Sequence, residues 1–199
     1  MKISTTHFTR RAASALLVAL TFSAGLTTAL AAEPAAPKVR FATTEGDFVV
    51  EVYPDKAPKT VENFLQYVKD KHYDGTIFHR VIGDFMIQGG GFDASMAEKP
   101  TRAPIALEAR NGLKNDRGTI AMARTREPNS ATAQFFVNVV DNSGLNAPQP
   151  DGNGYAVFGK VVQGMDTVDK IRGVATTNKG MYQNVPATPI VINSATLVK

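Results

Sequence analysis

Cysteine and tryptophan are absent from this 199-residue sequence, and histidine occurs only three times. Without thiols the chain can have no disulfide scaffold, no cysteine nucleophile and no cysteine-bound zinc. The histidines at positions 7, 72 and 79 are too few for a convincing metal cluster or hydrolytic triad, and we expect His79 to be a hydrogen-bonded packing residue. We therefore expect no metal and no cofactor. Packing alone must hold the fold, which is feasible because a domain of roughly 160 residues buries about two-thirds of its chain surface.

Acidic residues are missing from the first 31 positions, whose pattern predicts a secretory signal peptide. Lys2, Arg10 and Arg11 precede an apolar run over residues 12–20, and residues 29–31 form an A-x-A cleavage pattern. A membrane anchor is the alternative, but the run is shorter than the ~20 residues that a transmembrane helix needs. We expect cleavage after residue 31, export by the general secretory route, a mobile Pro/Ala tether over residues 32–38, and one domain over residues 39–199.

Excess charge is also missing outside this leader. Loss of its three basic residues would reduce the formal charge from +4 to about +1. A nearly neutral domain has no electrostatic basis for binding nucleic acid or an anionic membrane, so we expect neither nucleic acid nor a stable membrane association after cleavage. No apolar stripe is left over for a partner subunit, which favours a monomer.

Short strands dominate the rest of the chain. Alternating apolar residues predict a hairpin over residues 39–52 and strands over residues 118–123, 134–140, 156–162 and 190–197. Val61, Phe64, Leu65 and Val68 follow helical spacing and predict a helix within residues 55–73, with Thr60 facing water. A second short helix is predicted near residues 165–171. Many short strands, two helices and no βαβ rhythm indicate an antiparallel barrel or sandwich, between which composition does not choose.

Residues 78–91, FHRVIGDFMIQGGG, form the most informative stretch. Alternation places His79 and Val81 on one face of an extended segment and Phe78 and Arg80 on the other. Gly83-Asp84 is turn chemistry, so the stretch predicts a hairpin, and the following glycines would allow a bulge or a tight exit from the strand. An arginine and a glutamine among apolar strand residues are costly to bury unless they are paired. They either reach solvent or belong to a site.

This stretch resembles the signature of the cyclophilin family of peptidyl-prolyl isomerases. Two further segments match in the same order, SATAQFF at residues 130–136 and AVFGKV at residues 156–161. With compatible spacing, the three segments cover nearly all of residues 39–199. The resemblance implies a mainly β fold, a closed eight-stranded antiparallel β-barrel with an α-helix at each end. The chain also resembles the bacterial secreted branch, the periplasmic rotamase A type, which implies a periplasmic folding factor.

The resemblance also implies the site residues. Arg80 would be the catalytic residue, donating to the prolyl nitrogen as the peptide bond twists. An apolar seat for the proline ring and a polar wall for the flanking backbone would be formed by Phe85, Met86, Gln88, Ala123, Arg124, Gln134, Phe136 and Leu145. Within this set the Arg124 backbone would pair with the peptide, and Gln88 would donate to a substrate carbonyl. We expect Phe135, beside Phe136, to be core.

The chain departs from the family pattern in three places. Gly144 stands where many eukaryotic cyclophilins carry tryptophan, Tyr155 stands where they carry histidine, and Arg124 replaces a common asparagine. An indole that could cover a ligand and donate a hydrogen bond is therefore missing. We expect weak binding of the cyclic peptide cyclosporin and unchanged chemistry.

The reaction that needs no nucleophile is rotation about the bond before proline, which takes tens of seconds unaided. We therefore expect a peptidyl-prolyl cis-trans isomerase that acts, without a cofactor, on proline-containing segments of unfolded or partly folded secreted proteins. The alternative is a proline-peptide-binding module or holdase chaperone that uses the same groove without useful turnover. The presence of both Arg80 and Gln88 favours the enzyme.

Overall fold

The computed structural model describes residues 1–2 and 36–198. Residues 3–31 of the predicted signal peptide and most of the predicted tether lie outside the described residues. The helices are α1 (Pro58–Lys69) and α2 (Met165–Arg172), with a 3₁₀ turn η1 (Ser143–Leu145). The strands are β1 (Lys38–Thr43), β2 (Gly46–Val52), β3 (Thr76–Ile82), β4 (Met86–Asp93), β5 (Thr119–Met122), β6 (Phe135–Asn138), β7 (Val157–Gln163), β8 (Thr176–Lys179), β9 (Tyr182–Pro186) and β10 (Ile192–Val198). No helix of the described part is long and apolar enough to cross a membrane.

Eight strands form one antiparallel sheet in the order β10-β1-β2-β7-β5-β6-β4-β3. The sheet curls so that its two edge strands approach each other through the isolated bridge Ile77–Val191. The Phe78 amide also donates to the Ile190 carbonyl at 3.0 Å. The predicted fold class is confirmed: mainly β, eight antiparallel strands and two helices. The expected closure of the barrel is overstated, because β3 and β10 meet through isolated contacts instead of a continuous ladder.

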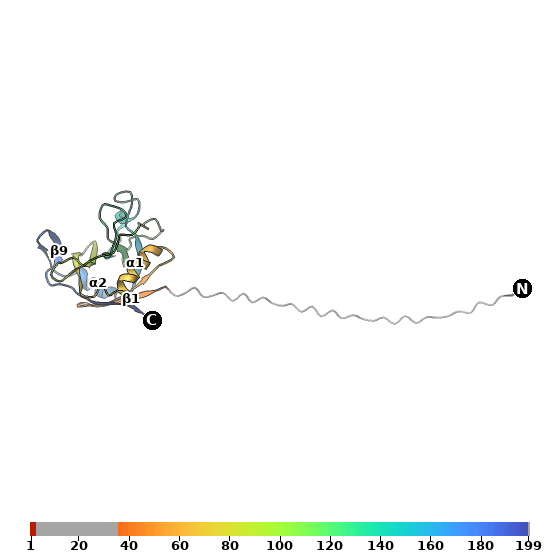
Figure 1. Cartoon of the computed structure of the whole chain (residues 1–199), viewed down its shortest axis with the longest axis horizontal. Coiled ribbons are helices and arrows are strands. Elements are labelled where there is room, and N and C mark those ends of the chain that lie inside the picture. The colour runs from red at the N-terminus through yellow and green to blue at the C-terminus, as the bar shows by residue number, and fades with distance from the viewer. Residues whose placement is uncertain (3–35, 199) are drawn as a thin grey trace. The chain divides into compact units, whose positions relative to one another are not determined.

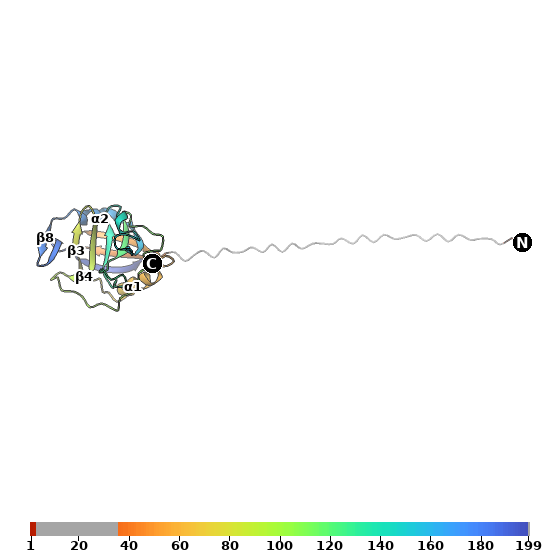
Figure 2. The ribbon, with the colours of Figure 1, turned by 90° about the horizontal axis from the view of Figure 1, so that it is seen from above.

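The helices lie on opposite sides of the curled sheet (Figure 2). The predicted stripe of α1 is confirmed, since Val61, Phe64 and Val68 are buried and Pro58 occupies the first turn, where no amide donor is needed. The prediction that Thr60 faces water is wrong, because this side chain is 1% exposed. The Thr60 hydroxyl and amide donate to the Glu108 carboxylate at 2.7 and 2.9 Å. A carboxylate distant in sequence thus caps the helix, which no local pattern can indicate.

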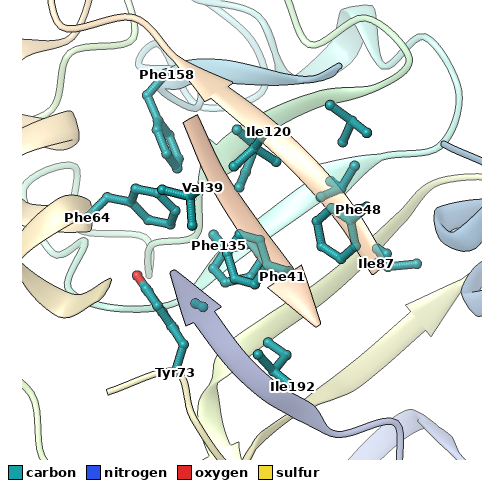
Figure 3. Packing of buried hydrophobic residues seen from close by; sticks show 14 of the residues in the cluster. Val39, Phe41, Phe48, Phe64, Tyr73, Ile87, Ile120, Phe135, Phe158 and Ile192 are labelled. Atoms are coloured by element: carbon teal, nitrogen blue, oxygen red, sulfur yellow. The ribbon is translucent and has the colours of Figure 1, made fainter. Parts of the chain in front are cut away.

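The inside of the curled sheet is filled by aromatic and β-branched side chains (Figure 3). Phe41 stacks on Phe48 with ring centroids 5.0 Å apart and also contacts Phe135 at 5.3 Å. Phe64 brings α1 into the same cluster through Phe158, 5.0 Å away. Because this interior holds the domain together, Phe135 is a core residue, as predicted.

The predicted hairpin over residues 78–91 is confirmed as β3 and β4, but its alternation is interrupted. The pairs Phe78–Gly89 and Arg80–Gln88 leave one extra residue on β3, which is a β-bulge. Phe78 and Val81 therefore both enter the interior cluster, whereas strict alternation places them on opposite faces. The glycines of β4 accommodate this irregularity, and Gly90 has a φ of 86° that side chains rarely adopt.

A second hairpin, β8 and β9, is present where sequence patterns predicted no element (Figures 1 and 2). Its two strands pair only with each other, and β9 lies beside β3. The residues of β8 are exposed or partly buried. This composition lacks the apolar alternation from which strands are recognised.

Candidate functional site

Four neighbouring strands place one row of side chains on the outer face of the sheet. Arg80 on β3 pairs with Gln88 on β4, Gln88 pairs with Phe136 on β6, and Phe136 pairs with Ala121 on β5. Directly paired residues of antiparallel strands point to the same face. The bulge in β3 thus sets Arg80 in line with Gln88, and the guanidinium reaches the same surface as the Phe136 ring.

A second apolar cluster covers this outer face, separate from the interior core. Its buried members are Met86, Ala121, Phe136 and Val157, and partly buried side chains pack around them. Adjacent residues of β6 therefore divide between the two clusters, with Phe135 inside the sheet and Phe136 outside. An apolar surface on the convex side of a sheet is a place where an apolar ligand can bind.

A cavity of about 130 Å³ opens above this cluster. Its lining includes eight of the predicted site residues, namely Arg80, Phe85, Met86, Gln88, Ala123, Arg124, Phe136 and Leu145. Tyr155 also lines it, and its ring meets Phe136 edge-on at 5.7 Å. Tyr155 stood out in the sequence only as a departure from the family pattern, so its contribution to the wall was not predicted.

Gln134 does not line this cavity but adjoins it. Its Oε1 accepts a hydrogen bond from Gln88 Nε2 at 2.9 Å, which leaves Gln88 Oε1 without a partner among the described residues. Gln134 lines a neighbouring cavity of about 320 Å³ with Gln88, Ala123 and Arg124. The two glutamines therefore form one polar wall between two cavities.

The Arg80 guanidinium is a free donor group in the lining of the 130 Å³ cavity. Among the described residues it makes no hydrogen bond and no ion pair, although the residue is partly buried. Arginine keeps its charge at all physiological pH values and carries five N–H groups in a rigid fork. An incoming acceptor therefore meets a fixed cation without displacing a protein partner.

Arg124 uses its side chain and its backbone for different purposes. The guanidinium donates to the Gly154 carbonyl and to Asp151 at 2.8 Å, and it lies 4.5 Å from the centroid of the Tyr155 ring. This hydrogen bonding holds the pKa of the Asp151 carboxyl at about 2. The Arg124 amide and carbonyl have no hydrogen-bond partner among the described residues. The side chain thus fastens the loop of residues 141–155, while the backbone stays available.

The same loop brings Leu145 and Tyr155 together. The Tyr155 amide donates to the Leu145 carbonyl at 2.9 Å, and Asn142 Nδ2 donates to the Phe85 carbonyl at 2.8 Å. Leu145 is thereby fixed across the cavity from the β3–β4 turn. A long polar loop without regular strands still presents a defined apolar side chain.

His79 lies close to the site without entering the 130 Å³ cavity. It packs against Phe92, with ring centroids 4.6 Å apart, and burial lowers its pKa to about 4. The expected packing is confirmed, but the expected hydrogen bond is wrong, because the buried Nδ1 has no hydrogen-bond partner among the described residues. The cavity lining itself supplies two guanidinium groups, one carboxamide, one phenol and apolar surface, with no carboxylate, thiol or imidazole. It can hold and polarise a ligand, but it offers none of those three groups as a nucleophile or general base.

Comparison with known proteins agrees with this geometry. Residues 38–197 match the family model described as "Cyclophilin type peptidyl-prolyl cis-trans isomerase/CLD". Peptidyl-prolyl cis-trans isomerase B of Escherichia coli K12 is 58% identical over 161 residues, which cover 80% of this chain and 98% of that protein. A peptidyl-prolyl cis-trans isomerase of Acinetobacter baylyi is 59% identical over 156 residues, covering 78% of this chain and 82% of the relative.

Solved structures give the same result at lower identity. A cyclophilin-type peptidyl-prolyl cis-trans isomerase of Cryptosporidium parvum superimposes with a TM-score of 0.69 at 27% identity, covering 82% of this chain and 98% of that one. A second structure of that protein, in the presence of the dipeptide Ala-Pro, gives a TM-score of 0.68 at 27% identity, covering 81% and 99%. On the match of residues 38–197 and the identity to its bacterial relatives, this chain belongs to the cyclophilin-type peptidyl-prolyl cis-trans isomerases.

Proposed function

We propose that the 130 Å³ cavity seats the pyrrolidine ring of an X-Pro segment and that Arg80 is the catalytic residue. The observation that carries this proposal is the unpartnered guanidinium in the lining of a cavity that also presents Phe85, Met86, Phe136 and Leu145 and has no carboxylate, thiol or imidazole. The ring of proline is apolar and needs such a seat, whereas its nitrogen needs a donor. The Cryptosporidium relative studied with Ala-Pro supports proline-containing peptides as the ligand class.

The proposed mechanism depends on a difference between two states of the peptide bond. In the planar state, amide resonance withdraws the nitrogen lone pair, and the rotation barrier is about 18–20 kcal/mol. In the twisted state the lone pair returns to nitrogen, which then accepts a hydrogen bond from Arg80. A donor that stabilises only the twisted state lowers the barrier, because catalysis requires stronger binding of the transition state than of the ground state.

The polar wall would hold the rest of the substrate still during the rotation. Gln88, which pairs with Gln134, is positioned to contact a substrate carbonyl as the Arg80 donors contact the nitrogen. The unpartnered amide and carbonyl of Arg124 would pair with the substrate backbone as an added strand does. One flank of the proline would then be fixed while the other turns.

The test is a comparison of Arg80→Ala with wild type in a cis-trans isomerisation assay on a short proline peptide. We expect kcat/KM to fall roughly 10²-fold, the usual loss when a donor to a developing charge is removed. Arg126→Ala is the matched control, because Arg126 is an exposed arginine outside the cavity, and it should stay within about twofold of wild type. Peptide binding by Arg80→Ala should persist; an unchanged kcat/KM would contradict the proposed role.

We further propose that the enzyme works as a monomer in the periplasm, on unfolded or partly folded secreted proteins. The support is the basic start, short apolar run and A-x-A pattern of residues 1–31. Expression in a Gram-negative host, followed by fractionation, N-terminal sequencing and sedimentation, tests this proposal. We expect a periplasmic monomer that begins at Ala32. A chain recovered in the cytoplasm with its first 31 residues intact would contradict the location, and a dimer would contradict the assembly.

A further inference from the structure

A second cavity, of about 280 Å³, adjoins the 130 Å³ cavity, which we call the proline cavity after its proposed role. Arg80 and Gln88 line both cavities, so a chain that leaves the proline cavity across these two residues enters the second one. The opposite wall consists of residues 181–184 at the turn of the β8–β9 hairpin and the start of β9. The second cavity is therefore continuous with the proposed catalytic site and is closed on one side by an element that no sequence pattern indicated.

The hairpin forms a firm wall at this position. Tyr182 meets Phe92 of β4 edge-on at 5.3 Å, and Phe92 packs on His79 of β3. Two consecutive aromatic contacts thus fasten the hairpin to the strands that carry Arg80 and Gln88, and such contacts add to the apolar surface they bury. The cavity has a defined shape because both of its walls share this anchor.

Met181 stands free at the tip of the hairpin. Lys179 pairs with Tyr182 across a turn formed by Gly180 and Met181, and Gly180 has a φ of 58°, which suits this turn. The Met181 side chain is 86% exposed while it lines the cavity. A single exposed apolar residue is ordinary, but this one is held over a cavity beside the catalytic arginine. Methionine adapts to irregular apolar partners and favours aromatic rings.

The remaining lining is polar and comes from Gln183, Asn184 and the buried His79. The carboxamides of Gln183 and Asn184 make no hydrogen bond among the described residues, and both line the cavity. Together with the free Oε1 of Gln88 and the Arg80 guanidinium, they offer both donors and acceptors, and the backbone of an extended peptide needs both. Carboxamides carry no charge, so they favour a peptide backbone over an ionic ligand.

We propose that this cavity is a second substrate subsite, which binds an extended segment next to the proline and takes an apolar, preferably aromatic, side chain against Met181. The proposal rests on the proposed function, since it assigns Arg80 and Gln88 to the centre of a longer substrate. The β8–β9 hairpin is then a specificity element: it makes the enzyme more efficient on long polypeptide segments than on the minimal proline peptide.

The experiment compares two sets of peptides with the full chain. The first set is a single tetrapeptide that contains the proline. The second set extends this tetrapeptide by three residues on either side, and each of its members carries one phenylalanine at a different added position. We expect at least one extended peptide to exceed the tetrapeptide in kcat/KM by about fivefold or more, the gain typical of burying one apolar side chain. In the double variant Met181→Ala, Gln183→Ala that gain should disappear while the tetrapeptide rate is unchanged.

The matched control is Leu197→Ala, which removes an exposed apolar side chain of β10 that lines neither cavity. It should keep the gain. Chemical-shift mapping supplies a second readout on the unmutated chain: the extended peptide should shift the amides of residues 181–184, and the tetrapeptide should not.

The outcomes separate this inference from the proposed function. If wild type does not isomerise the tetrapeptide, the proposed function fails. If it does so but no extension helps, or the gain survives the double variant, or residues 181–184 do not shift, the subsite is overturned.

Discussion

At the scale of single residues, burial decides which charges the domain tolerates. His79 is 5% exposed and lies next to Arg80 in the chain, and desolvation is the larger of the two causes that lower its pKa. The same strand therefore carries a cation at the surface and a neutral imidazole below it. The buried imidazole makes the stability of the domain sensitive to acid.

We predict that the free energy of unfolding decreases as the pH is lowered, because of His79. Its pKa is about 4 in the folded chain and about 6.5 when unfolded, so the unfolded state takes up a proton first as the pH falls. The destabilisation caused by His79 is absent well above pH 6.5, grows as the pH falls from 6.5 to 4, and is constant below that. Urea unfolding at pH 7 and 4.5 should differ by about 2.5 kcal/mol from this residue alone.

His79→Leu is the test of that assignment. The variant should show a much smaller loss between the two pH values. Burial also lowers the pKa of His72, so a residual slope in the same direction is expected. An unchanged slope in His79→Leu would contradict the prediction.

Gly144 gives a second prediction at this scale. A Cβ atom built on Gly144 meets nothing within 4 Å, so a large side chain has room beside Leu145. We expect Gly144→Trp to raise the affinity for cyclosporin about tenfold, through a ring that covers the ligand and an N–H that donates to it. Titration of the inhibitor in the isomerisation assay measures this, with Leu197→Trp as the control. Equal inhibition of wild type and Gly144→Trp would count against the covering role.

At the scale of elements, the loop of residues 141–155 determines the shape of the proline cavity. It has only one turn of 3₁₀ helix, yet it supplies Leu145 and Tyr155 to the lining. Its position depends on the Arg124 side chain, which is 1% exposed and bridges Asp151 and Gly154. Arg124, which differs from the common family asparagine, therefore has a structural task in this chain.

We predict that Arg124→Ala loosens this loop. Loss of a buried, charged hydrogen-bond network should lower the free energy of unfolding by about 2 kcal/mol and speed hydrogen exchange of the Tyr155 amide. KM for a proline peptide should rise more than kcat falls, because the cavity wall moves while Arg80 stays in place. Arg110→Ala is the control, since this exposed arginine donates to Gly152 of the same loop; if it has the same effect, the role assigned to Arg124 is wrong.

Elements also show where sequence reasoning succeeds and where it stops. Period and turn chemistry were enough for the β1–β2 and β3–β4 hairpins and for both helices. The bulge at Arg80 was not foreseen, because its extra residue is visible only in the pairing with β4. The cap on α1 by Glu108 joins residues that are 48 apart, and β8 has no apolar alternation. The family resemblance brought eight distant residues to one cavity; no residue pattern alone would have done so.

At the scale of the whole molecule, the curled sheet separates two apolar clusters. The cluster inside it holds the domain together, and the smaller cluster outside it forms the floor of the proline cavity. β6 contributes neighbouring phenylalanines to both, Phe135 to the interior and Phe136 to the cavity. Phe135 and Phe136 therefore allow the two clusters to be compared with the same residue type on the same strand, on opposite faces of the sheet.

We predict opposite results for the two phenylalanines. Phe135→Leu should lower the free energy of unfolding by about 1–2 kcal/mol, because it leaves space in a close-packed interior, while kcat/KM of the folded enzyme stays within about twofold. Phe136→Leu should lower kcat/KM about tenfold with a smaller loss of stability. Urea unfolding and the isomerisation assay measure both variants. Equal losses of activity would show that the two clusters are not independent.

The placement of the smaller cluster on the convex face has a consequence for the shape of the molecules that can be processed. Because the floor of the cavity consists of strand residues on the outer face of the sheet, no hinge motion is needed to expose it. A peptide can therefore bind through an internal segment, without inserting one of its ends. We therefore expect prolines in cyclic peptides, in loops between folded domains and at internal positions of long chains to be isomerised as fast as prolines in short linear peptides of the same local sequence.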